Sequence, residues 1–133
     1  SKPGHAETLD GELRPLRLTN AEIERFEVEH RTGIFGLFDA LMGRGDPPQL
    51  RHVRDIVALG LVGGGMSERR ADALMARLGP DQALHLRAVA ARLIGVTFLP
   101  AVAEAAAAEK KSPGGRRRAS QPPAPTPGAP EPV

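Results

Sequence analysis

Apolar residues recur every three to four positions through most of the chain, which is the period of helices that bury one face. Five such segments lie between residue 19 and about residue 110, separated by short runs of Gly, Pro or Ser. The second and fifth segments have the most regular stripes: Ile34, Leu37, Phe38, Leu41 and Met42, then Leu86, Val89, Ala90, Leu93, Ile94, Thr97 and Phe98. The pattern predicts a small, mainly α domain of about five helices.

Residues typical of helix N-termini precede three of these segments. Thr19, followed by Glu22, matches a capping box at the first helix. Asp46 is the N-cap expected for the third helix, with Pro47 at its first position. Ser67 is the N-cap expected for the fourth helix.

Three consecutive glycines, Gly63 to Gly65, follow the third helix. A phosphate-binding glycine loop instead follows a strand and opens a helix, with a Lys placed to neutralise charge. We therefore interpret the triplet as a helix end, because glycine has the largest backbone entropy. Gly60, on the apolar stripe of the same helix, is expected to let another helix approach closely.

The N-terminal region contains one hairpin signal. Asp10-Gly11 lies between two short runs, Thr8-Leu9 and Glu12-Leu13, and this dipeptide accepts the positive φ angles of a tight primed turn. Pro15 lacks an N–H group, so its strand must lie at an edge or carry a bulge. Two strands alone are marginally stable, so the hairpin must pack on the helices.

The composition changes at the C-terminal end. Seven of the last 22 residues are Pro, which predicts a disordered segment. The net charge is +2, but residues 1–109 carry 13 basic and 15 acidic side chains, while residues 110–133 carry five and one. We therefore predict a helical domain over 1–109 and a disordered Pro/Arg-rich tail over 110–133. The Ala-rich stretch 101–108 favours helix but has little to pack against.

No feature indicates a membrane or an oxidising compartment. The chain has no Cys, and its apolar stretches are far shorter than the ~20 residues of a membrane span. No apolar signal-peptide core follows Ser1. We expect a soluble, intracellular chain.

The types of side chain that commonly carry catalysis are scattered along the sequence. The four His fall in different predicted elements, and His52 and His85 are interpreted as helix-surface residues. No Ser stands in a nucleophile elbow. The pair Glu68 and Asp72 adjoins Arg residues on a solvated helix face, and no acid–base pair has an apolar setting. We therefore expect no catalytic, cofactor-binding or metal-binding residues, no small-molecule substrate, and no enzyme activity.

Nucleic-acid binding receives little support. The fourth helix carries Arg69, Arg70 and Arg77, but acidic residues interrupt them. With four Phe and no Tyr or Trp, the chain lacks a base-stacking platform. A regulator that uses the tail residues Arg116–Arg118 stays an alternative. It predicts a steep salt dependence of DNA affinity that disappears when residues 112–133 are deleted.

Three segments together resemble the small tail protein of gene transfer agents and related alphaproteobacterial prophages. They are residues 16–24 (LRLTNAEIE), 53–65 (VRDIVALGLVGGG) and 89–98 (VAARLIGVTF). The resemblance covers roughly residues 7–100 and leaves out the Pro-rich extension after Lys111. It implies a short hairpin, a helix, a glycine-ended helix and a final amphipathic helix.

That family is treated as a tail assembly chaperone and is also labelled a tail tube protein. The resemblance implies a non-catalytic role in building a phage-like tail. We expect a chaperone that binds the tape-measure protein in the bacterial cytoplasm during particle assembly. Phe35, Phe98 and Leu99 are the candidate partner-binding residues. The alternative is a tube-associated component that stays with the particle, and the oligomeric state stays open.

Overall fold

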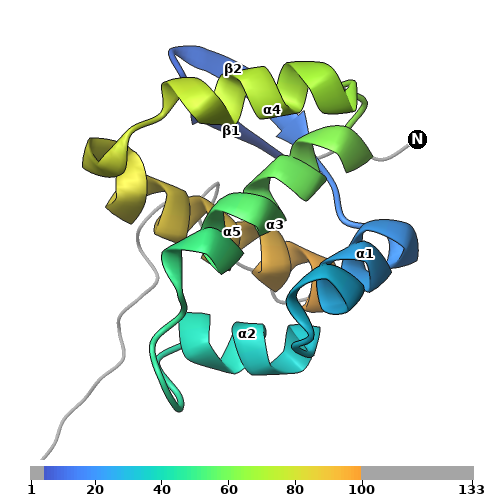
Figure 1. Cartoon of the computed structure of the whole chain (residues 1–133), viewed down its shortest axis with the longest axis vertical. Helices are drawn as coiled ribbons and strands as arrows, with labels where there is room; N and C mark the ends of the chain where they lie inside the picture. Colours follow the sequence, from blue (N-terminus) through green and yellow to red (C-terminus); the bar gives the residue numbers. More distant parts are fainter. Residues whose placement is uncertain (1–4, 100–133) are drawn as a thin grey trace, which may run out of the picture. The chain divides into compact units, whose positions relative to one another are not determined.

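The computed structural model describes residues 5–99, which form a helical body with one hairpin (Figure 1). This confirms the predicted fold class. The predicted tail at 110–133 and the Ala-rich stretch 101–108 lie outside the described residues. The elements in order are β1 (His5–Leu9), β2 (Glu12–Leu16), α1 (Asn20–His30), α2 (Ile34–Leu41), α3 (Leu50–Gly63), α4 (Glu68–Arg77), the 3-10 turn η1 (Pro80–Gln82) and α5 (Ala83–Phe98).

Helix α3 is the central element of the body. It packs against α1, α4, α5 and β2, as Figure 1 shows. The sequence predicted one apolar stripe on this helix, yet Leu59, outside that stripe, is also buried. A helix covered on several sides buries residues that a one-faced pattern leaves out. None of the helices between residues 5 and 99 has the length and apolar character that crossing a bilayer requires.

The hairpin forms as predicted. Asp10 and Gly11 have φ angles of 53° and 82°, the positive values of a primed turn, and Leu9 pairs with Glu12 across it. Hydrogen-bonded pairs alternate along an antiparallel ladder, so the Ala6–Pro15 pair falls at a non-hydrogen-bonded position. The missing N–H of Pro15 therefore removes no ladder bond.

Close backbone contacts join the hairpin to the end of α3. The backbone N–H of Arg17 donates to the Gly60 carbonyl at 2.9 Å. A Cβ atom at Gly60 would meet Leu93 Cδ2 of α5 at 2.6 Å, which confirms the predicted close approach at this glycine. At Gly63 a Cβ atom would lie 1.9 Å from the Arg17 carbonyl oxygen, and at Gly64 2.3 Å from that of Pro15. The triplet ends α3 as predicted, and it also lets the hairpin lie against the helix end.

Two of the three predicted helix starts are correct. A Glu22 carboxylate oxygen accepts from the backbone N–H of Thr19 at 2.6 Å, as a capping box requires. Ser67 Oγ accepts from the backbone N–H of Arg70 at 3.2 Å at the start of α4.

The predicted start of the third helix is wrong. Its N-cap is Gln49 and not Asp46, so the helix begins at Leu50. The physical reason is the double proline: Pro48 pushes the preceding Pro47 out of the α region, which the first residue of a helix must occupy. Pro47 therefore does not serve as the first residue of a helix.

Candidate functional site

The three predicted partner-binding residues lie at the junction of α2 and α5. Phe35 of α2 is 67% exposed, and its ring centroid is 5.3 Å from that of Phe98 at the end of α5. Phe98 is half-buried against the core, and Leu99 is 43% exposed. Phe38, one helical turn after Phe35, packs edge-on against Phe98, with 5.8 Å between the ring centroids. We call these four residues the aromatic surface.

The aromatic surface adjoins the hydrophobic core, against which Phe38 and Phe98 pack. Ile34, Leu37 and Leu41 of α2 are buried in the core, and Ile94 anchors the last turns of α5 there. Phe38 also faces the guanidinium of Arg44, whose Cζ is 5.7 Å from the ring centroid. The arrangement leaves one largely exposed aromatic ring, Phe35, beside residues that pack on the core.

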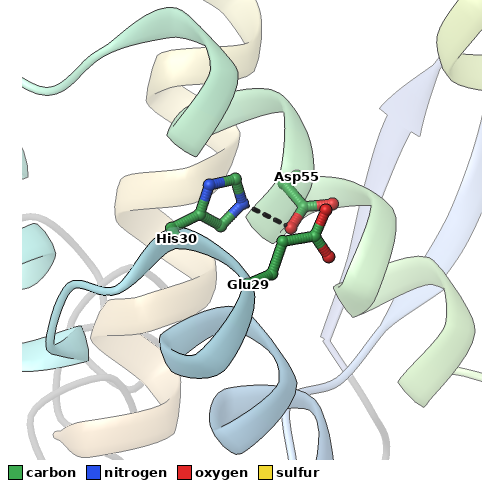
Figure 2. Close-up of side chains that lie close together, drawn as sticks. All are labelled: Glu29, His30 and Asp55. Atoms are coloured by element: carbon green, nitrogen blue, oxygen red, sulfur yellow. Dashed lines mark hydrogen bonds and ion pairs between the residues drawn. The ribbon is translucent and has the colours of Figure 1, made fainter.

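A second cluster was not predicted from the sequence. His30, at the end of α1, faces Asp55 of α3, and Glu29 lies beside them (Figure 2). His30 Nε2 and Asp55 Oδ2 are 2.7 Å apart. Each of the three residues offers one atom that could ligate a metal ion, and these atoms all lie within 4.8 Å of one another. The sequence pattern, which places the four histidines in different elements, did not predict this convergence. No local spacing signals this cluster, because its members come from two helices about 25 residues apart.

The surroundings of His30 favour a hydrogen bond between helices over a metal centre. Nη1 of Arg51 lies 3.3 Å from His30 Nδ1, and a guanidinium only donates. Nδ1 is therefore assigned as the acceptor and Nε2–H as the donor to Asp55. A metal-bound imidazole normally donates its second N–H to a carboxylate or carbonyl, and Arg51 cannot accept it. We interpret the cluster as a link between α1 and α3.

The interpretation of His52 as a helix-surface residue is wrong. Its ring packs edge-on against His30 and Phe26, at centroid distances of 4.8 and 5.7 Å. Nε2 of His52 is buried without a hydrogen-bond partner among the described residues. The start of α3 brings the ring over the buried Phe26 because α1 and α3 pack against each other. His85 does lie on a helix surface, where it contacts the Thr8 carbonyl oxygen at 2.8 Å.

We expect His52 to take up its proton at a lower pH than an exposed histidine does. Burial lowers the pKa of its imidazole below the ordinary 6.5, and the positive charge of Arg51 lowers it further. Just below pH 6.5 the unfolded chain then binds a proton that the folded chain does not, so the free energy of unfolding falls as the pH drops through this range. Titration of the ring protons by NMR measures the pKa. A value at or above 6.5 would contradict the packing described here.

The structure also contains a buried carboxylate that the sequence did not reveal. Glu7 of β1 is 8% exposed and accepts two hydrogen bonds from Arg92 of α5, both 2.8 Å long. His5 Nε2 lies 2.7 Å from the same carboxylate. Burial raises the pKa of Glu7, but the hydrogen bonds from Arg92 and His5 outweigh it, so the pKa is lowered. The expectation of no titratable pair in an apolar setting is therefore wrong, and this pair fixes the hairpin to α5.

Comparison with known proteins identifies the family. Residues 3–100 match the family model described as phage tail tube protein, GTA-gp10, which covers the hairpin and all five helices. Searches of curated proteins and of solved structures give no match. The carboxylate and imidazole clusters thus lie within the family region, where they join elements of the body. The chain belongs to this family of structural tail proteins, which links it to the tails of phages and gene transfer agents.

Proposed function

We propose that this protein is a tail assembly chaperone that binds the tape-measure protein through the aromatic surface. The observation that carries the proposal is the exposed ring of Phe35 beside Phe98 and Leu99. A large aromatic ring that is exposed to water contributes little to the stability of the fold. Exposed aromatic rings are common anchors of protein interfaces. Other tail proteins are the partners that family membership suggests.

The tape-measure protein is the partner whose chemistry suits this surface. It is long, helical and apolar, and it must stay soluble until tube subunits polymerise around it. An amphipathic helix presents apolar side chains at i, i+3, i+4 and i+7, which can pack on a small aromatic platform. Phe35 and Phe98 come from two helices, so a helix laid across their junction would contact both.

Replacing Phe35 tests the proposal. We expect Phe35→Ser to weaken capture of a co-expressed tape-measure fragment by about 30-fold, because a central aromatic anchor is worth ~2 kcal/mol or more. Stability should change little, since the side chain is 67% exposed. Val28→Ser is the matched control, because Val28 is 78% exposed but lies on α1. Equal losses in both variants, or capture by neither variant nor the natural chain, would reject the proposal.

A structural component of the tail is the second candidate, and the description of the family as a tail tube protein favours it. Tail tubes are generally rings of β-rich barrels, whereas the described body has one two-stranded sheet. Mass spectrometry of purified particles separates the candidates. A chaperone leaves before the particle is finished, whereas a tube-associated component persists at a fixed copy number.

A further inference from the structure

A hollow lined by three arginines lies between the hairpin and α4. Its volume is about 220 Å³, and its lining consists of Arg14, Met66, Arg70, Ala73, Leu74 and Arg77. The four residues from α4 are spaced i, i+3, i+4 and i+7, so they share one face of that helix. Figure 1 places α4 along the hairpin, at the end of the body away from α2.

Two of the three guanidinium groups are held in place by the fold. Arg14 Nε donates to the Leu9 carbonyl at 2.9 Å, and only 13% of the Arg14 side chain is exposed. Arg77 Nε donates to Asp10 at 3.0 Å. Arginines that are already fixed lose little conformational entropy when a ligand binds.

Of the three guanidinium groups that line the hollow, two already have a carboxylate partner and one does not. Arg77 pairs with Asp10, and Arg14 Nη2 lies 3.8 Å from Glu12, which is 75% exposed. Arg70 is exposed and has no carboxylate within 4.0 Å among residues 5–99. Its donors are therefore available to a ligand.

The chemistry of the lining points to a carboxylate next to an apolar group. Guanidinium groups bind carboxylates and phosphates through paired N–H donors. Met66, Ala73 and Leu74 add an apolar floor, which suits the side chains of a peptide. Nucleic acid fits less well, because its extended phosphate backbone would run past the exposed Asp72 on the same helix, whereas a short acidic segment has to reach only the hollow. We propose that this hollow binds an acidic segment of a protein partner, independently of the aromatic surface.

The test uses the full chain labelled with ¹⁵N and a blocked Leu-Asp-Glu-Leu peptide as the probe. We expect the peptide to shift the amide signals of Arg70, Ala73 and Arg77, and the amidated counterpart Leu-Asn-Gln-Leu to leave them in place. Arg70→Gln should weaken peptide binding about tenfold, which corresponds to one charge-assisted hydrogen bond. Arg69→Gln is the control, because it removes the same charge from the same helix outside the hollow.

Each other result would overturn the proposal. No shift with the acidic peptide would exclude the site, and equal losses in Arg69→Gln and Arg70→Gln would indicate unspecific charge attraction. Tighter binding of inorganic phosphate than of the peptide would assign the hollow to a free anion. Larger shifts with a DNA duplex than with the peptide, at equal concentration, would assign it to nucleic acid.

Discussion

Gly63→Ala is expected to destabilise the fold by about 3 kcal/mol, which lowers the melting temperature by about 15 °C for a domain of this size. The added Cβ would lie 1.9 Å from the carbonyl oxygen and 2.9 Å from the carbonyl carbon of Arg17. A backbone segment cannot yield as a flexible side chain does. Separating the two segments would also strain the hydrogen bond from the Arg17 N–H to Gly60.

Gly36→Ala is the matched control for this experiment. Gly36 lies within α2, and nothing stands within 4 Å of the position its Cβ would take. The added methyl group should therefore stabilise the helix, by about 0.5–1 kcal/mol. Thermal or urea unfolding of both variants measures the difference. A Gly63→Ala variant as stable as the natural chain would contradict the close packing of the hairpin on α3.

The glycine triplet illustrates what the sequence can and cannot predict. That Gly63 ends a helix follows from backbone entropy, which is a local property. That its Cβ position is occupied by Arg17 depends on how the hairpin returns to α3, and no local pattern encodes that contact. The local interpretation was correct but incomplete.

Most of the predictions that rest on neighbouring residues are correct. The hairpin turn, the capping box at Thr19 and the cap at Ser67 depend on residues within four positions of each other, and all three are confirmed. The start of α3 was also a local question. The pattern of Asp46 as cap and Pro47 as first residue leaves out the constraint that Pro48 places on Pro47.

The polar clusters were beyond the reach of the sequence. Glu7 and Arg92 are 85 positions apart, and His30 and Asp55 are 25 apart, so only the tertiary packing joins them. One signal was available: Glu7 stands on the same face of its strand as Leu9, the face that the hairpin buries. A carboxylate on a buried face requires a partner, although the pattern does not say which one. The exposure of Phe35 could be predicted from the sequence, because the residue lies off the apolar stripe of its own helix.

We expect Glu7→Gln to lower the free energy of unfolding by about 2 kcal/mol. The amide retains the shape of the side chain but loses the charge that strengthens both hydrogen bonds from Arg92. Glu12→Gln is the matched control, because Glu12 lies on the other strand of the same hairpin and is 75% exposed. Its distant contact with Arg14 should contribute less than about 0.5 kcal/mol. Urea unfolding at neutral pH compares the two variants with the natural chain.

The advantage of the natural chain over Glu7→Gln should depend on pH in a defined direction. The pKa of Glu7 in the folded state lies below the ordinary 4.5, so the folded chain holds its carboxylate charged where the unfolded chain already binds a proton. The contribution of Glu7 is therefore fully present above pH 4.5 and is lost as the pH falls through the folded-state pKa. Unfolding midpoints of both chains, measured from neutral pH downward, should converge below pH 4.5. A difference that stays constant across this range would mean that Glu7 stabilises the hairpin by its shape and not by its charge.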